Sequence, residues 1–477
     1  MLHRARRKLR LAGALALAGG SLFAGGGPAV AAATANVVIK PMLISKFVSS
    51  KQPPTQAQCD ATFLAPCYQP SQIQAAYNTP PLYNSGITGA GQTIVLVDSF
   101  GSPTIQSDLA TFDSTFGLPA PPSFKIIQPA GKVPAYNPNN ANEAGWAGET
   151  TLDVEWSHAM APGANILLVE TPVAETEGTA GFPQIVEAEN YVINHHLGQV
   201  ISQSFGATEE SFPNAASIYG LRTAYLNALK NHVTVLASAG DGGPANALNV
   251  AGTVLSTHPT VNWPASDPLV TAVGGTQLAL LPGGGQRAQA DRVWDDSVNY
   301  DLNNVFGSPG PYAQATGGGV SAVFPRPSYQ DGVASVTGDY RGVPDISMSA
   351  ACSGLVLIYE GVPGAQAGWY VTCGTSEASP LFAGIVALAD QEAGHSLGFI
   401  NPDLYALSAE HAPGIVDVTT GNNTVSFIQD NHLVTVQGYH AGPGYDLASG
   451  VGTVNAALFV PELVAQATGG VHYMPFG

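Results

Sequence analysis

Charged residues are scarce in this chain, and basic residues are the scarcest. Only 10% of its 477 residues are charged, against roughly 25% in an ordinary domain. Five of the 16 Lys and Arg fall in the first ten residues, so the remainder carries 11 basic residues against 34 acidic ones, a formal charge of −23. This sign disfavours nucleic acid as a partner. It also leaves little positive self-repulsion once carboxylates are protonated, which suits folding at low pH.

Long apolar runs are confined to the N-terminus. A basic start that contains Arg6 and Arg7 precedes an apolar stretch over residues 11–23 and small residues over 29–31. This order is typical of an export signal, which we place at residues 1–33. A twin-arginine signal fits, and a general secretory signal fits nearly as well. No later segment has about 20 unbroken apolar residues, so we expect a secreted, extracellular protein with no membrane span in its mature form.

Cysteine is also rare, with four residues in the chain. Cys59 and Cys67 could close one small loop, and Cys352 and Cys373 another. An oxidising compartment outside the cell favours disulfides, although buried free thiols remain an alternative. The absence of Cys-x-x-Cys or clustered Cys/His spacing disfavours a zinc site.

Strand-like and helix-like patterns alternate along the chain. Their order predicts an α/β fold with a mostly parallel central sheet flanked by helices, in a single large domain. The hydrophobic content of 45% is enough for a sizeable core. Residues 241–330, rich in Gly, Pro, Asn and Ala, predict long loops beside a cleft. The predicted strands are 94–98, 124–128, 165–170, 199–204, 233–238 and 269–273, and the predicted helices are 105–116, 149–160, 184–197 and 216–231.

Ser376 stands where a run of small residues meets an apolar segment. The run over residues 374–380 (GTSEASP) precedes the stretch 381–389, which predicts a buried helix. Small residues permit a tight turn and a close approach by a substrate, and the free N–H groups of a helix start can face an oxyanion. Ser376 is therefore a candidate nucleophile. A helix N-cap without chemistry is the alternative.

A serine nucleophile needs a base, and no histidine of the chain lies in a motif that would supply one. Glu149 and Asp153 are better candidates, because a helix places residues four apart on one face. Two such carboxylates repel when both are ionised, so one pKa rises and the pair shares a proton. Glu149 would then take the proton from Ser376, with Asp153 orienting it. A solvated acidic helix face is the alternative, and Glu155 belongs to it.

Asp241 follows the apolar strand pattern over residues 233–239. It therefore lies at the C-terminal end of a predicted strand, where open α/β sheets bind ligands. A protonated Asp241 could donate a hydrogen bond to an oxyanion beside the N–H of Ser376. The alternative is an ordinary Asp-Gly turn.

These motifs, in this order, make the chain resemble the sedolisin family of serine-carboxyl peptidases over residues 68–477. The resemblance implies a subtilisin-like three-layer fold and an acid-active endopeptidase that cleaves proteins or peptides. Glu149 and Asp153 match the family's Glu-x-x-x-Asp, Asp241 its oxyanion residue and Ser376 its nucleophile. Further similar segments are 68–78, 89–99, 200–206, 316–321 and 341–347.

The resemblance also implies one structural calcium ion near the C-terminus. Two carboxylates and the carbonyls of a Gly-rich loop are hard oxygen ligands of the kind that calcium binds. A surface turn is the alternative. By resemblance the ligands are the carboxylates of Asp417 and Asp446 and the carbonyls of Val418, Gly442 and Gly444.

Two features depart from the family. Residues 34–67 form only a short N-terminal extension, so no large prodomain is expected and the restraint on activity is left open. Asp98, in Val97-Asp98-Ser99, matches the first catalytic Asp of ordinary subtilisins in its position, but without a partner histidine it is given a structural role. We expect a monomer. A catalytically silent binding protein and an esterase or transpeptidase remain rival functions.

Overall fold

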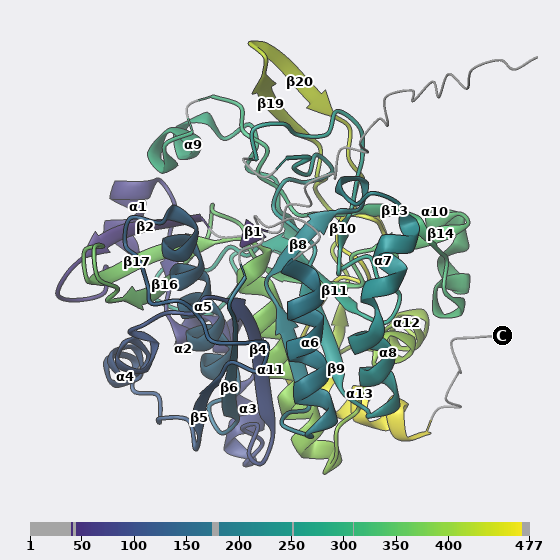
Figure 1. The fold of residues 1–477 in the computed structure, drawn as a ribbon, viewed down its shortest axis with the longest axis horizontal. Coiled ribbons are helices and arrows are strands. Elements are labelled where there is room, and N and C mark those ends of the chain that lie inside the picture. Colours follow the sequence, from purple (N-terminus) through teal and green to yellow (C-terminus); the bar gives the residue numbers. More distant parts are fainter. Residues whose placement is uncertain (1–39, 42–43, 174–180, 250–251, 309, 470–477) are drawn as a thin grey trace, which may run out of the picture. The chain divides into compact units, whose positions relative to one another are not determined.

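An eight-stranded sheet organises the computed structural model, which describes residues 40–41, 44–173, 181–249, 252–308 and 310–469 (Figure 1). All pairs within it are parallel except β11–β12. The sheet order is β12 (Arg292–Val293), β11 (Thr271–Gln277), β9 (Thr234–Ser238), β7 (Val200–Gln203), β4 (Thr93–Ser99), β6 (Asn165–Thr171) and β5 (Phe124–Ile127), with β15 (Ile346–Ser349) also pairing with β11.

Alternate side chains of the central strands enter two separate cores. In β4, Ile94 and Leu96 join the larger core, whereas Val95 and Val97 join the second one. Successive residues of a strand point to opposite faces, so a strand covered on both faces must be apolar throughout. This requirement explains the nearly continuous apolar run that predicted β4.

Helices cover both faces of the sheet, as Figure 1 shows. α5 (Ala141–Met160) and α11 (Thr375–Ala393) contribute to the larger core, and α6 (Gly181–Asn194) and α8 (Thr223–Lys230) to the second. The predicted subtilisin-like α/β fold is confirmed. Among the described residues, no helix has the length and apolar character needed to cross a membrane.

The predicted elements differ from the observed ones at several boundaries. α5 begins at Ala141, eight residues before the predicted start at 149. The predicted helix 216–231 is two helices, α7 (Ala215–Leu221) and α8, which meet at Arg222. Residues 241–330 are not only loops, since they also contain β10 (Asn262–Trp263), β11, β12, α9 (Tyr300–Phe306) and β13 (Gly319–Pro325).

The described part of the N-terminal extension is built into the domain. β1 (Lys40–Pro41) pairs with β8 (Phe205–Thr208), and β2 (Ile44–Ser49) pairs with β17 (Gly368–Cys373). α1 (Gln56–Phe63) leads to β3 (Cys67–Tyr68), and β2, β17, β16 (Leu355–Glu360) and β3 form one sheet. Both predicted disulfides, Cys59–Cys67 and Cys352–Cys373, are confirmed. The predicted export signal lies outside the described residues.

The remaining elements surround these sheets. They are α2 (Pro70–Ala76), α3 (Pro80–Asn84), α4 (Ile105–Phe116), the short helices η2 (Glu209–Ser211) and η3 (Ser328–Val333), α10 (Ala334–Thr337), β14 (Tyr340–Val343), α12 (Asn401–Ala409), β18 (Ile415–Val416), β19 (Val425–Gln429), β20 (His432–Val436), β21 (Thr453–Val454) and α13 (Ala456–Gly469).

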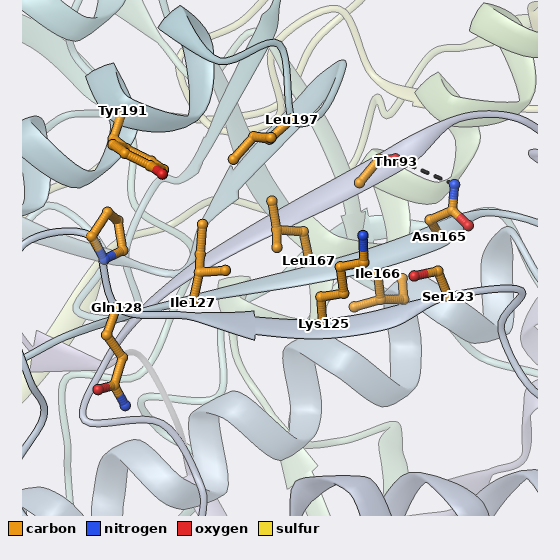
Figure 2. Close-up of a pocket in the computed structure, with 11 residues that line it drawn as sticks. Thr93, Ser123, Lys125, Ile127, Gln128, Asn165, Ile166, Leu167, Tyr191 and Leu197 are labelled. Atoms are coloured by element: carbon orange, nitrogen blue, oxygen red, sulfur yellow. Dashed lines mark hydrogen bonds between the residues drawn. The ribbon is translucent and has the colours of Figure 1, made fainter.

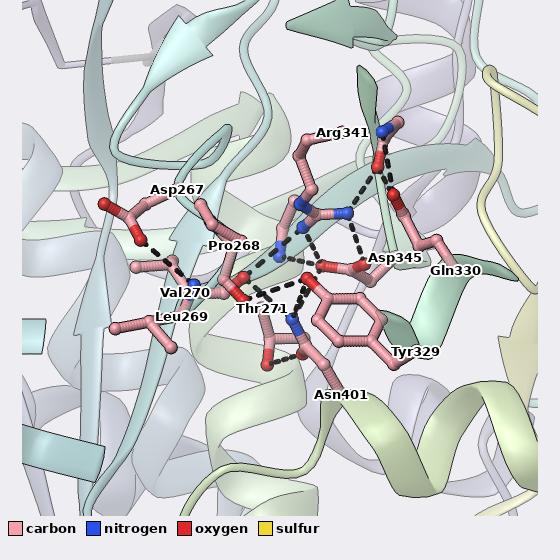
Figure 3. A network of polar contacts seen from close by, with 12 residues as sticks. Asp267, Pro268, Leu269, Val270, Thr271, Tyr329, Gln330, Arg341, Asp345 and Asn401 are labelled. Atoms are coloured by element: carbon pink, nitrogen blue, oxygen red, sulfur yellow. Dashed lines mark hydrogen bonds and ion pairs between the residues drawn. The ribbon is translucent and has the colours of Figure 1, made fainter. Parts of the chain in front are cut away.

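A buried ion pair joins β14, β15 and α12 (Figure 3). Arg341 and Asp345 are both fully buried, and the guanidinium binds both carboxylate oxygens. The same carboxylate accepts the Ala272 N–H at 2.8 Å and the Tyr405 hydroxyl at 2.9 Å. A buried charge is tolerated only when it is paired and hydrogen-bonded in this way. The network therefore fixes the turn between β14 and β15 against β11.

Candidate active site

Ser376 lies in the first turn of α11, in agreement with the predicted helix start. Gly374, the N-cap, has φ of 129°, a conformation that side chains disfavour and glycine permits. Ser376 is fully buried, and its Oγ donates to the Ser204 carbonyl at 3.5 Å. So long a contact leaves the hydroxyl free to turn towards another acceptor.

Pro380 leaves the carbonyl of Ser376, the candidate nucleophile, without its usual helical donor. In a helix the N–H of residue 380 would bond to the carbonyl of Ser376, but proline has no N–H. The Ser204 hydroxyl instead lies 3.5 Å from this carbonyl. That same hydroxyl donates to Asp153 Oδ1 at 2.7 Å. Ser204 thus links the backbone of Ser376 to the carboxyl of Asp153, a role that we did not predict from the sequence.

Glu149 and Asp153 lie on α5, which packs against α11. The close approach of the two helices depends on Gly384, since a Cβ there would come within 2.4 Å of the Met160 Cβ. Both carboxylates are fully buried. Neither oxygen of Glu149 has a hydrogen-bond partner among the described residues, yet the Ser376 hydroxyl lies near enough to lower its pKa. Such contacts often tighten only when substrate binds.

The pKa values of this pair are strongly raised. Burial is the main cause for both residues. For Glu149 the second cause is the charge of Asp153, so ionisation of one carboxyl opposes ionisation of the other. The solvated acidic face that was the alternative is therefore wrong for these residues. The assignment of Glu155 to a solvated face is also wrong, because Glu155 is buried; it accepts the Tyr359 N–H and does not share the pair's contacts.

Asp98 is electrically coupled to the pair. It lies near the C-terminal end of β4 and is buried, and its charge raises the pKa of both Asp153 and Glu149. Burial raises its own pKa to about 8. The structural role that we gave Asp98 therefore omitted its influence on the carboxylate pair.

Asp241 lies three residues after β9, as its motif predicts, and faces the start of α11. Its Oδ1 accepts the N–H and the hydroxyl of Thr375 at 2.7 and 2.8 Å. Its Oδ2 has no partner among the described residues. Burial raises the pKa of Asp241 to about 7. Asp241 can thus hold a proton on Oδ2 in acid while Thr375 fixes its orientation.

Histidine takes no part in this cluster. Among the described residues, the groups that shift the pKa of Glu149 and Asp153 are hydroxyls and carboxyls. His158 lies on the same helix, but its Nε2 contacts the Pro119 carbonyl at 2.8 Å and Asp113 Oδ1 at 3.3 Å. The arrangement can therefore move a proton between serine and carboxylates, without an imidazole.

The residues predicted to bind calcium come together near β18. Asp417 Oδ2 accepts the Gly444 N–H at 2.8 Å, and Asp446 Oδ2 accepts the Gly442 N–H at 3.1 Å. The Ser449 hydroxyl lies 3.1 Å from both Asp446 oxygens and 3.4 Å from the Val418 carbonyl. Two carboxylates match the charge of a divalent cation, and carbonyls can complete its shell. Within the described ranges, no group of three or more His, Cys, Asp or Glu side chains could hold a metal. The donor set fits calcium only if carbonyls supply most of the ligands.

A cavity of about 760 Å³ lies apart from these residues (Figure 2). It includes Thr93 and Asn165, the first residues of β4 and β6, whose side chains are hydrogen-bonded at 3.4 Å. Ligands of parallel sheets bind at the opposite, C-terminal strand ends. None of the residues of the candidate active site lines this cavity.

Comparison with known proteins assigns this chain to a family. The protein family described as "Subtilase family" matches residues 130–439, which are well over half of the chain. The chain belongs to the subtilase family. Kumamolisin of Bacillus sp. (strain MN-32) is 32% identical over 410 residues, 84% of this chain and 64% of kumamolisin. Sedolisin of Pseudomonas sp. (strain 101) is 29% identical, over 82% of this chain and 60% of its own length.

Two further similarities fall within the sedolisin group. Human tripeptidyl-peptidase 1 is 30% identical over 75% of this chain and 58% of its own length. The solved structure of Pseudomonas sedolisin, described as a serine-carboxyl proteinase, superposes with a TM-score of 0.67 at 26% identity and covers 84% of this chain and 99% of that chain. The predicted sedolisin resemblance is confirmed. The matched segment spans less than two thirds of the length of these three curated relatives.

Proposed function

We propose that this subtilase is a secreted, acid-active serine-carboxyl endopeptidase that hydrolyses proteins or peptides. The observation that supports this most directly is the convergence of Ser376 with the buried carboxyls of Glu149 and Asp153 and with the half-buried carboxyl of Asp241. Placing several carboxyls together without a cationic partner costs folding free energy. Clusters of acids with raised pKa values are typical of functional sites.

The proposed reaction begins with proton transfer from Ser376 to Glu149. The Ser376 oxygen attacks the peptide carbonyl, and Glu149 then returns the proton to the leaving amine, which leaves an acyl-enzyme. Water then hydrolyses the acyl-enzyme. Glu149 takes a proton from the water as its oxygen attacks the acyl carbon, and the proton passes to the Ser376 oxygen as the acyl group leaves. Asp153, held by Ser204, keeps Glu149 oriented and shares its proton.

Asp241 stabilises the tetrahedral intermediate in this proposal. Its protonated Oδ2 donates to the oxyanion beside the Ser376 N–H, which is free because it lies at a helix start. A donor in a buried site is worth more than one in water. With the pKa of Asp241 raised to about 7, the proton is present throughout the acid range.

Calcium is proposed as a structural ion at the C-terminal loop. Asp417, Asp446 and the carbonyls of Val418, Gly442 and Gly444 would hold it, and when bound it supplies charge neutralisation between segments distant in sequence. An ion that binds only the folded state adds to stability. It has no part in the bond-breaking steps.

The proposal is tested by the hydrolysis of a denatured protein and of a small ester at pH 4, with wild type and Ser376→Ala. Protein cleavage that the substitution abolishes supports an endopeptidase. Ester turnover without protein cleavage supports the esterase or transpeptidase reading instead. If the folded wild type turns over neither substrate, the proposal fails and a silent binding protein is the better account. Sedimentation of the same sample tests the expected monomer.

A further inference from the structure

The second core ends at β5, the edge strand of the central sheet. β5 pairs only with β6, and Ile127 of β5 is partly buried at the margin of this core. Leu197, which follows α6, lies at the same margin. The cavity of about 760 Å³ in Figure 2 includes both residues. Its volume falls within the range of about 300–1,000 Å³ that is typical of small-molecule sites.

Strand alternation directs one set of side chains into this cavity. Ser123, Lys125 and Ile127 follow one another at intervals of two residues, so their side chains point to the same face of the sheet. Lys125 pairs in register with Leu167 of β6, and Asn165 precedes Leu167 by two residues on that face. All five residues line the cavity. The register therefore places a cation, a hydroxyl and an amide beside apolar side chains.

Lys125 has no acidic partner among the residues that the structure describes. The ion pairs found there all involve other basic side chains. None of the described residues that line the cavity is Asp or Glu. Asn165 donates one N–H to the Thr93 hydroxyl at 3.4 Å, which leaves its second N–H for another acceptor. This end of the cavity is therefore positive and offers hydrogen-bond donors, on a chain that is strongly acidic as a whole.

Apolar side chains separate this polar end from Tyr191. Figure 2 shows Ile127, Leu167 and Leu197 between the polar end and Tyr191 of α6. The Tyr191 ring stacks on His195 with ring centroids 4.0 Å apart, which fixes this wall of the cavity. An ammonium attracts an anion, and apolar surface favours the burial of a hydrocarbon chain. A ligand that matches both ends therefore has a negative group and an apolar chain.

We propose that this cavity binds a small carboxylate with an apolar chain. The carboxylate accepts hydrogen bonds from the Lys125 ammonium and from the second N–H of Asn165, and such bonds between charged groups are stronger than neutral ones. The chain lies along Ile127, Leu167 and Leu197 and excludes water from them. A free fatty acid and the C-terminal end of a short peptide share this chemistry. The site is separate from the candidate active site and does not depend on the proposed catalysis.

Calorimetric titration of the Ser376→Ala protein at pH 6 tests the site. At this pH a carboxylate is ionised and a lysine is protonated. Octanoate represents a fatty acid, acetyl-Leu-Leu represents a peptide end, and octanamide is the uncharged analogue of octanoate. We expect at least one of the two carboxylates to bind with one-to-one stoichiometry, and the one that binds identifies the source of the ligand. Octanamide should bind about tenfold more weakly than octanoate if octanoate is the ligand.

Lys125→Gln and Lys132→Gln form a matched pair of variants. Both remove one positive charge from an exposed lysine, but Lys132 does not line the cavity. Lys125→Gln should weaken binding of the carboxylate about tenfold, and Lys132→Gln should bind it like the wild-type cavity. A carboxylate that binds Lys125→Gln as tightly as Lys132→Gln lies elsewhere, for instance at the candidate active site, and would overturn the inference. The absence of binding by either carboxylate at millimolar concentration would overturn it too.

The apolar part of the site has its own test, which needs no variant. Affinity should rise from hexanoate to octanoate to decanoate by up to about fourfold for each methylene that is buried. In the same way, acetyl-Leu-Leu should bind more tightly than acetyl-Gly-Gly. Ile127→Trp, which fills the cavity with a side chain suited to a strand, should abolish binding at an unchanged melting temperature. Affinity that does not depend on the apolar chain would reduce the site to a charge contact and would overturn the inference.

Discussion

Asp241 is held by Thr375, the residue directly before Ser376. The Thr375 N–H and hydroxyl both donate to Asp241 Oδ1, at 2.7 and 2.8 Å. The Thr375 hydroxyl in turn accepts the Gly240 N–H at 3.0 Å. Oδ1 of Asp241 thus accepts two hydrogen bonds, whereas Oδ2, which we propose carries a proton and faces the oxyanion, has no partner among the described residues. A carboxyl from the end of β9 and the serine of α11 form one unit.

Asp241→Asn tests this role through the pH profile. Asparagine can accept from Thr375 with its oxygen and donate with its NH₂ group, and it does not titrate. Wild-type kcat should fall as pH rises through about 7, the raised pKa of Asp241. The alkaline limb should move to higher pH in Asp241→Asn, whereas Asp241→Ala should lose about 10²–10³ in kcat at every pH. An unchanged alkaline limb in Asp241→Asn would assign it to another group.

Stability should be greatest in acid and should fall as pH rises. Burial raises the pKa of Asp98 and Glu189 to about 8 and that of Asp390 to about 7, above ordinary values near 4. The native state therefore binds more protons than the unfolded chain between pH 4 and 8. The contribution of these three groups to the free energy of unfolding is fully present below pH 4, and it is lost as the pH rises through 7–8. Thermal unfolding at pH 3 to 8 measures it.

Glu189→Gln provides the control for this pH dependence. Glu189 is buried, with neither oxygen hydrogen-bonded among the described residues, and it contributes nothing to the candidate active site. The substitution should reduce the loss of stability between pH 4 and 8 by up to about 5 kcal/mol. If the free energy of unfolding of Glu189→Gln changes with pH as steeply as that of the wild type, Glu189 is not a source of the pH dependence.

Removal of calcium should lower the melting temperature. At a calcium concentration about 1,000 times the Kd, bound ion adds about 4 kcal/mol. A chelator should therefore destabilise the wild type strongly and Asp446→Asn hardly at all. Asp430→Asn, in the exposed turn between β19 and β20, is the matched control and should respond like the wild type. A wild type indifferent to chelator and to added calcium would exclude the structural ion.

Arg341→Met should be among the most damaging substitutions outside the active site. It leaves the Asp345 carboxylate buried without its cation, at a cost of about 3–5 kcal/mol. Arg326→Met removes a more exposed pair with Asp331 and should cost at most about 1 kcal/mol. Urea unfolding of both variants at pH 5 compares them. Equal costs would show that the Asp345 network compensates for the lost charge.

The sequence predicts those parts of the site that follow from local periodicity. Glu149 and Asp153 share a helix face because they are four residues apart, and Asp241 follows a strand because its apolar run ends there. Ser204 was not predicted, since its role arises only when β7 brings it against α11. The ion pair of Arg341 with Asp345 and the pairing of β1 with β8 likewise depend on contacts between distant segments, which no local pattern encodes.

The most direct test of the account is the pH dependence of kcat for Glu149→Gln beside Glu155→Gln. Both residues are buried glutamates of α5, but only Glu149 lies near Ser376. The account predicts that Glu149→Gln loses about 10²–10⁴ in kcat across the acid range, while Glu155→Gln stays within a few-fold of the wild type. Full acid activity in folded Glu149→Gln would contradict proton transfer by a carboxylate.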